Sequence, residues 1–369
     1  MPSSIAIDIL PILFLFLCIF GAKITKPLSS INSKDYLSLA TSKSYRGLFA
    51  ILVIFLHLSQ KTESGVLFRY STFMGILPVP FFFFLSGYGL QKSYMTKTDK
   101  YKEGFLLKRL PTVLIPYIII TAVYWLMHFF LGHFYSLQEI IHTFIIGWPI
   151  AEYSWFIVNI LVFYVIFWLL MHLCKKHYLM MILGGFIWYI LHFIFCYKMK
   201  YGGFWYVSSQ LLVIGMFWAL YEQNIINLFK KKYIILTILS AGLFFIFSYL
   251  PSLISPNNKL NYILVNLSPY LTRIFFVISI LALFLKIQFG NKILNFLGEI
   301  SLELYISHGL FIKVLRSKFI FINNELIWSI SVLAGTILFS YGLHKLFQAI
   351  LNVYKRTVLK PKVKNLAIL

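Results

Sequence analysis

The chain has 369 residues, of which 60% are hydrophobic, 19% are aromatic and only 12% are charged. Soluble domains carry about a quarter charged residues, so this composition excludes an ordinary soluble protein and predicts an all-α polytopic membrane protein. The formal net charge of +22 does not indicate nucleic-acid binding. The basic residues lie in short loops between apolar segments, where Lys and Arg hold cytoplasmic loops against anionic lipid.

Eleven apolar segments follow one another along the chain, and most approach the ~20 residues that a membrane-crossing helix needs. They are residues 5–22, 45–60, 76–90, 110–131, 154–173, 179–196, 204–221, 233–250, 264–285, 296–312 and 326–350. No Lys or Arg precedes the first segment, so it lacks the basic start of a cleavable signal. We expect a retained helix with the N-terminus outside. The predicted inside loops then hold most of the Lys and Arg residues, which favours eleven spans and a cytoplasmic C-terminus.

The second apolar segment carries an arginine and a histidine on one stripe. Ten residues, all apolar or glycine, separate Arg46 from His57. At about 100° per residue the helix turns roughly 20° past three full turns between them, so both side chains face the same way, about 16 Å apart. Ionisable groups are costly in hydrocarbon and usually face a cavity or a partner. We therefore expect both groups to face a common polar chamber within the membrane.

The chemistry of this pair suits acyl transfer. A neutral imidazole can take a hydroxyl proton and return it near neutral pH. The guanidinium of Arg46, at the predicted cytoplasmic end, can bind phosphate or carboxylate through two hydrogen bonds. An intramembrane histidine standing alone is more often a structural hydrogen-bonding group, but the arginine three turns away favours a reaction site at His57.

Four later stretches carry aromatic, basic and small residues at fixed spacings. They are residues 79–88 (VPFFFFLSGY), 107–117 (LKRLPTVLIPY), 154–164 (SWFIVNILVFY) and 298–308 (GEISLELYISH). Together with the Arg-x10-His pattern they resemble, in order, the motifs of the membrane acyltransferase-3 family. Each motif is short, but five in the same order over residues 43–350 make the resemblance specific.

The resemblance implies a core of ten helices with both ends in the cytoplasm, and an enzyme that moves acyl groups, usually acetyl, onto glycans. Segment 5–22 is then one extra helix before the core. We expect an N-terminal helix and cytoplasmic linker at 1–42, the acyltransferase domain at 43–350 and a basic cytoplasmic tail at 351–369.

Two cations, Lys108 and Arg109, lie at the entry to the third core helix. By themselves they are ordinary positive-inside anchors. The resemblance makes them candidate ligands for the phosphates of acyl-coenzyme A, whose several negative charges cations would hold. The family often has several arginines here, whereas this chain has these two cations. No metal site and no tightly bound cofactor is expected, because no Cys or His cluster has ligand spacing.

Five further residues are candidates for lining the substrate site: Ser86, Trp155, Glu303, Tyr305 and His308. Ser86 also fits close helix packing, and Trp155 also fits an interfacial aromatic belt. Tyr305 and His308 share a helix face, which suits either a polar lining or hydrogen bonds between helices. Glu303 could orient a histidine or pair with Arg46.

The sequence leaves two interpretations for each of two features predicted to lie near the outer surface. Arg273 could extend its side chain to the outer interface or line the pocket. The outer loop 132–153, which has no Lys or Arg, could form the rim of an outer pocket or be a simple polar loop.

The sequence therefore predicts an inner-membrane O-acyltransferase that uses acyl-coenzyme A from the cytoplasmic face. The expected acceptor is a cell-surface glycan or its lipid-linked precursor. His57 would act as a general base or carry the acyl group, and Arg46 would position the donor or stabilise charge at the reacting carbonyl. One rival is a non-enzymatic transporter of a lipid-linked sugar. A second is another class of membrane acyltransferase, in which His308 would be essential and Arg46 dispensable.

Overall fold

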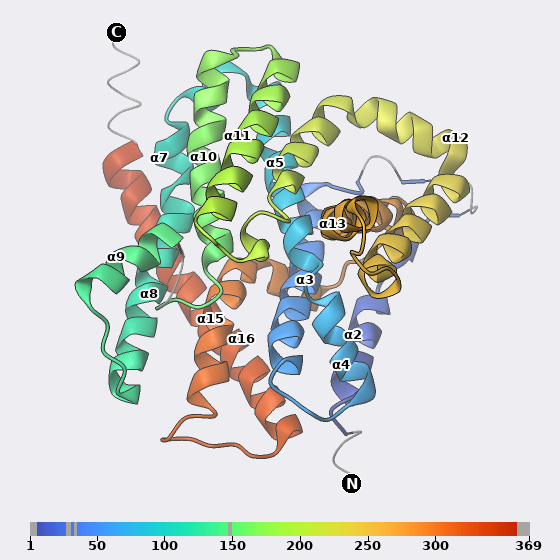
Figure 1. Ribbon diagram of the computed structural model, residues 1–369. Coiled ribbons are helices and arrows are strands. Elements are labelled where there is room, and N and C mark those ends of the chain that lie inside the picture. The colour runs from blue at the N-terminus through green and yellow to red at the C-terminus, as the bar shows by residue number, and fades with distance from the viewer. Residues whose placement is uncertain (1–5, 27–30, 33–34, 147–149, 360–369) are drawn as a thin grey trace.

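The computed structural model describes residues 6–26, 31–32, 35–146 and 150–359. Long helices dominate these residues, as predicted for an all-α membrane protein (Figure 1). The longer helices are α2 (Ile9–Ile19), α3 (Leu39–Ser59), α5 (Pro78–Lys97), α8 (Pro111–Leu131), α10 (Trp155–Leu173), α11 (Tyr178–Lys198), α12 (Gln210–Leu253), α13 (Lys259–Lys286), α15 (Ser301–Val314) and α16 (Glu325–Tyr354). The shorter elements are β1 (Lys23–Ile24), α4 (Val66–Met74), α6 (Asp99–Lys102), α7 (Phe105–Arg109), α9 (Leu137–Ile146), η1 (Gly203–Trp205), β2 (Ile287–Gln288), α14 (Lys292–Glu299) and η2 (Lys355–Leu359).

Among the described residues, eight helical stretches are long and apolar enough to cross a membrane, so the expected count of eleven is not confirmed. The difference has three sources. Segment 5–22 forms only the short α2, and segment 296–312 is broken into α14 and α15. Segments 204–221 and 233–250 count as one stretch because α12 runs through both, although its backbone leaves helical geometry at Tyr221 and Lys232, where these segments were predicted to end and to begin.

Helix α12 changes direction twice along its length, at Tyr221 and at Lys232, where the backbone leaves helical φ/ψ values. Figure 1 shows it rising beside α5, crossing the top of the molecule and descending on the right. Next to the first bend, the carboxylate of Glu222 accepts a hydrogen bond from the Tyr88 hydroxyl at 2.7 Å and pairs with Lys92 at 2.5 Å. The first bend is therefore tied to α5, and the two bends lie at the predicted end of segment 204–221 and the predicted start of segment 233–250.

The short helix α2 extends from near the C-terminal end of α3 to near the N-terminal end of α3, although α2 is shorter than a membrane span. At its start, the Asp8 carboxylate accepts backbone N–H bonds from Val66 and Phe68 at the beginning of α4. Beyond its end, β1 pairs antiparallel with β2, and Asn291 donates to the carbonyl of Leu17. These contacts make α2 antiparallel to α3.

Backbone-to-backbone packing between α5 and α12 depends on two glycines. A Cβ added to Gly87 would lie 1.8 Å from the carbonyl oxygen of Leu212, and one added to Gly215 would lie 2.2 Å from that of Phe84. Only glycine permits such close approach of two helices. Gly87, next to Ser86, therefore lies at a close helix contact, whereas a Cβ added to Gly89 would meet no atom within 4 Å, and Gly89 lines a cavity.

Candidate functional site

A large cavity lies beside the C-terminal half of α3, and we call it the His57 cavity. Its volume is about 1230 Å³, and His57, Tyr153, Trp155, Arg273 and Tyr305 contribute to its wall. Trp155 also contacts other aromatic rings of this wall, its ring centroid 5.4 Å from that of Phe204 in a tilted arrangement. The structure thus places both Trp155 and Arg273 on the wall of the cavity.

His57 is held by ring contacts on one side and by one hydrogen bond on the other. Its ring centroid lies 3.9 Å from that of Tyr153 and 5.1 Å from that of His308. Its Nδ1 lies 3.2 Å from Oε1 of Gln60. Because an amide oxygen can only accept, Nδ1 carries the proton in this arrangement and Nε2 keeps the free lone pair. The described part of the chain offers Nε2 no hydrogen-bond partner, so this nitrogen is available as a base.

Tyr153 links the loop before α10 to the site. It adopts a left-handed backbone conformation, with φ of 65°, and its carbonyl oxygen accepts a hydrogen bond from the Tyr305 hydroxyl at 2.8 Å. Burial, together with the neighbouring carboxylate of Glu152, raises the pKa of the Tyr153 phenol to about 12. The phenol therefore stays neutral at physiological pH and does not compete with His57 as a base.

A second, smaller cavity lies beside the N-terminal half of α3, and we call it the Arg46 cavity. Its volume is about 370 Å³, and Arg46, Ser86, Arg109 and Tyr305 line it. Arg109 donates from Nη2 to the Tyr101 hydroxyl at 3.0 Å. Arg46 has neither a hydrogen bond nor an acidic partner within the described ranges. Its guanidinium is thus open to a ligand that enters this cavity.

The two halves of α3 therefore serve two cavities, which corrects the expectation of one common chamber. Tyr305 is the residue that lines both. It extends from α15, which packs against α3, and its ring lies 5.2 Å from that of Phe156 on the wall of the Arg46 cavity. The helical spacing of Arg46 and His57 could not reveal that they line different cavities.

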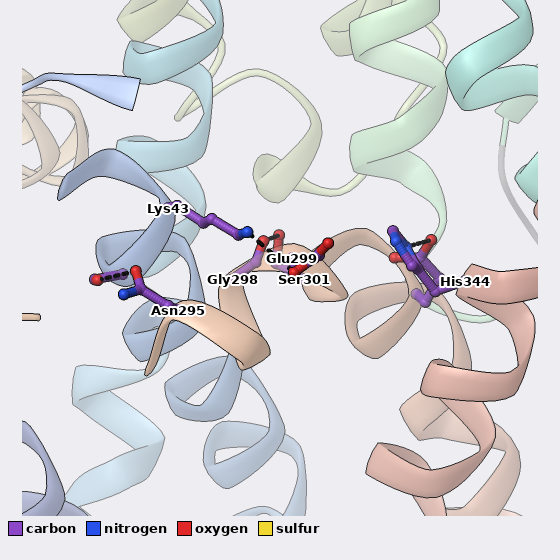
Figure 2. A network of polar contacts seen from close by, with 8 residues as sticks. Lys43, Asn295, Gly298, Glu299, Ser301 and His344 are labelled. Atoms are coloured by element: carbon purple, nitrogen blue, oxygen red, sulfur yellow. Dashed lines mark hydrogen bonds and ion pairs between the residues drawn. The ribbon is translucent and has the colours of Figure 1, made fainter. Parts of the chain in front are cut away.

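Contacts with α14 fix the position of the N-terminal half of α3. A Cβ on Gly298 would lie 1.8 Å from the carbonyl oxygen of Lys43, so the two backbones touch. Figure 2 shows Lys43 reaching across to Glu299, with a separation of 3.0 Å, and Asn295 accepting a hydrogen bond of 2.6 Å from Ser44. These contacts hold the turn before Arg46 against α14.

Two candidate residues lie away from the cavities. Glu303 is buried and pairs with His344 of α16 at 2.9 Å, which Figure 2 shows, and it does not contact Arg46. Lys108 is exposed and donates to the backbone carbonyl of Glu103 at 2.9 Å. Lys108 lines neither cavity, so Arg109 is the residue of this pair that the fold turns inward.

His308 stands behind the site and does not line a cavity. It is fully buried, and its ring lies 5.0 Å from that of Tyr153. Its Nδ1 lies 3.3 Å from the carbonyl oxygen of Leu304 in the preceding turn, and Nε2 has no partner among the described residues. His308 therefore supports His57 and Tyr153 by packing.

The outer loop 132–153 does form part of a rim. His133 and Glu152 line the His57 cavity, whereas Glu139 accepts a hydrogen bond from the backbone of Ser136 and lines neither cavity. Sequence reasoning missed Lys313, which pairs with Glu152 at 2.6 Å. Its signal was a cation in a loop predicted to be outside, which the positive-inside rule does not explain, although the structure places Lys313 in the last turn of α15.

Comparison with known proteins gives one family. A family model described as an acyltransferase domain, the acyltransferase-3 type, matches residues 44–345. This range contains Arg46 and His57 of α3 and both cations at the entry to α8. Neither the curated proteins nor the solved structures include a match to the chain.

Proposed function

The chain belongs to the acyltransferase-3 family and is a multi-pass membrane acyltransferase; on that premise we propose a specific reaction for it. An acyl group, most simply acetyl, passes from acyl-coenzyme A to a hydroxyl of a cell-surface glycan or of its lipid-linked precursor. One observation carries this proposal: Arg46 and His57 lie on one helix and line two cavities that share Tyr305. Such a layout suits two substrates that approach from opposite ends of α3.

The Arg46 cavity is the proposed donor site. Arg46 has a free guanidinium there, and Arg109 keeps N–H groups beyond its one hydrogen bond to Tyr101. Guanidinium groups bind phosphate oxygens through paired, charge-assisted hydrogen bonds. The phosphates of coenzyme A would be held by these two residues, with the thioester directed towards Tyr305.

The His57 cavity is the proposed acceptor site. The Nε2 lone pair of His57 takes the proton of the attacking hydroxyl, whose oxygen forms a bond to the thioester carbonyl carbon. The carbon–sulfur bond then breaks, and the proton passes to the coenzyme A thiolate. In the alternative course, Nε2 attacks the thioester carbonyl carbon, the carbon–sulfur bond breaks and the coenzyme A thiolate leaves. The acceptor hydroxyl then attacks the acyl carbon, its proton is lost, and the bond from Nε2 to that carbon breaks.

We further propose that the protein lies in the cytoplasmic membrane with its N-terminus outside and its C-terminus in the cytoplasm. The basic Lys230–Lys232 run lies at the second bend of α12, and Lys175 and Lys176 lie in the turn between α10 and α11. Both turns lie in the upper part of the molecule in Figure 1, and their cations support a cytoplasmic side at that end.

Replacement of His57 by alanine tests the proposal. Loss of a general base lowers the rate by about 10²- to 10⁴-fold, so we expect His57→Ala to abolish measurable acylation. Purified wild-type and variant proteins would be compared for transfer of radiolabelled acetyl from acetyl-coenzyme A, and ester-linked acetyl on surface polysaccharide would be measured by NMR in complemented deletion strains. His177→Ala is the matched control, because His177 is exposed and lines neither cavity.

The outcome also separates the rivals. A transporter of lipid-linked sugar would leave glycan acylation unchanged in His57→Ala. An acyltransferase of another class, with its essential histidine late in the chain, would tolerate His57→Ala and lose activity in His308→Ala. Equal acylation by wild type, His57→Ala and the deletion strain would remove the enzyme proposal.

A further inference from the structure

The wall of the His57 cavity has a strongly unbalanced charge. Among the described residues that line it, six are cationic and Glu152 is the one carboxylate. The cations are Lys61, Lys200, Arg273, Lys313, Arg316 and Lys318. Glu152 pairs with Lys313, and the other five form no ion pair in the parts of the chain that are described, although the Glu325 carboxylate interacts electrostatically with Arg316. The cavity that holds the proposed base is therefore strongly positive.

Two of these cations are held in place by the protein and still keep free donors. Arg273 donates from Nε to the Ser208 hydroxyl at 3.0 Å and from Nη1 to the carbonyl of Pro269 at 2.8 Å. These bonds leave Nη2 without a partner in the described chain. An arginine oriented in this way loses little further freedom when it binds an anion.

Arg316 is fixed in a similar way. It donates from Nη1 to the carbonyl of Lys61 at 2.6 Å, and its guanidinium lies 3.9 Å from the centre of the Trp328 ring. Its Nε and Nη2 have no protein partner within the described ranges. Two guanidinium groups from α13 and from the loop after α15 are thus ready to receive carboxylate or phosphate oxygens.

We propose that the acceptor of this acyltransferase is an acidic glycan, whose carboxylate or phosphate groups bind the cations of the His57 cavity while a hydroxyl reaches His57. This proposal rests on the proposed function and names its acceptor class. Uncompensated cations concentrate anionic ligands and disfavour cationic ones. In the proposed orientation these cations lie on the outer side, where the positive-inside rule does not account for them.

The remaining wall suits sugar rings. Trp155, Tyr201, Phe204 and Trp205 line the same cavity, and Tyr201 lies 5.2 Å from Trp205 between ring centroids. Aromatic faces pack against the apolar faces of sugars, whereas the cations select charge. A neutral glycan would use the aromatic surface alone and would leave five cations without ligands.

Binding and transfer to defined acceptors test the proposal. The full-length protein would be placed in nanodiscs of phosphatidylcholine, which supplies no net negative charge. Three fluorescent oligomers of matched length serve as probes: oligogalacturonate with carboxylates, poly(glycerol phosphate) with phosphates, and neutral maltooligosaccharide. Affinity would be measured at about 0.05 M and about 0.5 M salt, and acetyl transfer from radiolabelled acetyl-coenzyme A would be measured in parallel.

Three exposed lysines supply the variant. Lys61, Lys200 and Lys318 are exposed and line the cavity, and they are replaced together by glutamine. The control replaces three exposed cations that do not line it, Arg69, Lys198 and Lys259, and removes the same charge. Because Lys198 and Lys200 lie in the same stretch of chain, the comparison isolates the cavity from general surface charge.

We expect at least one acidic oligomer to bind more tightly than the neutral one, and the difference to shrink at high salt. The triple lysine variant should bind that oligomer about tenfold more weakly, while the control triple variant binds as wild type does. Binding is read without turnover, so this result stands even where acetyl transfer fails. Failure of transfer in the presence of acidic-oligomer binding counts against the proposed function and not against this inference.

Four results overturn the inference. The first is equal or tighter binding of the neutral oligomer, and the second is equal weakening by the two triple variants. The third is complete displacement of the acidic oligomer by about 20% phosphatidylglycerol in the nanodisc, which assigns the cations to lipid headgroups. The fourth is competition between coenzyme A and the oligomer in the lysine-dependent site, which assigns these cations to the donor.

Discussion

The Arg46 cavity and the His57 cavity lie along the same helix and differ in size and in charge. The first has about 370 Å³ and two guanidinium groups, Arg46 and Arg109; the second has about 1230 Å³ and six cationic side chains. A small cavity with two forked cations suits the phosphates of one donor, whereas a large one suits a polymer segment. This difference indicates that the two halves of α3 line cavities suited to different ligands. Tyr305 lines both of them.

The replacement of Arg46 is expected to give the largest effect that distinguishes the roles of the two cavities. Loss of a charge-assisted hydrogen bond costs about 1.5–3 kcal/mol, so Arg46→Gln should raise KM for acetyl-coenzyme A about 10- to 100-fold. Arg46→Lys should recover only part of this loss, because an ammonium cannot form the paired bonds of a guanidinium. Steady-state kinetics with the donor varied at fixed acceptor provides the measurement.

Lys108→Gln is the matched control for Arg46→Gln, because Lys108 is exposed and lines neither cavity. We expect it to leave both KM values unchanged. A rise in the acceptor KM alone in Arg46→Gln would mean that the donor does not bind in the Arg46 cavity.

A smaller effect is expected at the shared residue. Tyr305→Phe removes the hydroxyl that donates to the carbonyl of Tyr153 and keeps the ring between the cavities. One neutral hydrogen bond contributes about 1 kcal/mol, so kcat should fall about fivefold. Both KM values should stay as they are, because neither substrate is proposed to bind the hydroxyl.

Tyr94→Phe provides the comparison for Tyr305→Phe. Tyr94 also donates to a backbone carbonyl, that of Lys175 at 2.7 Å, and it lines neither cavity. A similar fall in kcat in both variants would show that the effect at Tyr305 is one of general stability.

The smallest effect is expected at an ion pair far from both cavities. Lys176 donates to the Asp99 carboxylate at 2.9 Å, and this hydrogen bond lowers the pKa of Asp99. A carboxyl whose pKa is lower in the folded state stabilises the protein above its unfolded pKa of about 3.9, and this contribution is lost as pH falls through the folded value. Asp99→Asn should therefore lower Tm slightly at neutral pH and leave it unchanged near pH 2.

Thermal unfolding of the detergent-solubilised protein, followed by intrinsic fluorescence at both pH values, measures this difference. Acyl transfer by Asp99→Asn should equal that of wild type, because the pair is exposed and touches neither cavity. A difference in Tm that persists at the lower pH would assign the effect to something other than the charge of Asp99.

Much of the helical class and part of the candidate site could be predicted from the sequence. Apolar runs of membrane length predict helices directly, since lipid leaves the backbone no other partners. Helical periodicity put Arg46 and His57 on one stripe, and both do line cavities. The bends of α12 at Tyr221 and Lys232 lie where segments 204–221 and 233–250 were predicted to end and to begin, whereas the break of segment 296–312 into α14 and α15 was not predicted from apolar length.

Two adjacent cations show the same limit of prediction from local sequence. Lys108 and Arg109 are adjacent in the sequence, and nothing local distinguishes their roles. Helix geometry turns successive side chains about 100° apart, so one faces the Arg46 cavity while the other stays exposed. The choice between them depends on how α7 packs against its neighbours.

By itself, the sequence determined the helical membrane class, the motif order of the family and the alignment of a guanidinium with an imidazole on α3. These properties are local, because they follow from apolar length and from the repeat of a single helix. Only the tertiary structure decided that Tyr305 lines both cavities, that Glu303 pairs with His344, and that cations from four separate stretches of the chain line the His57 cavity. Contacts between distant parts of the chain depend on how helices pack, and no spacing within one helix encodes them.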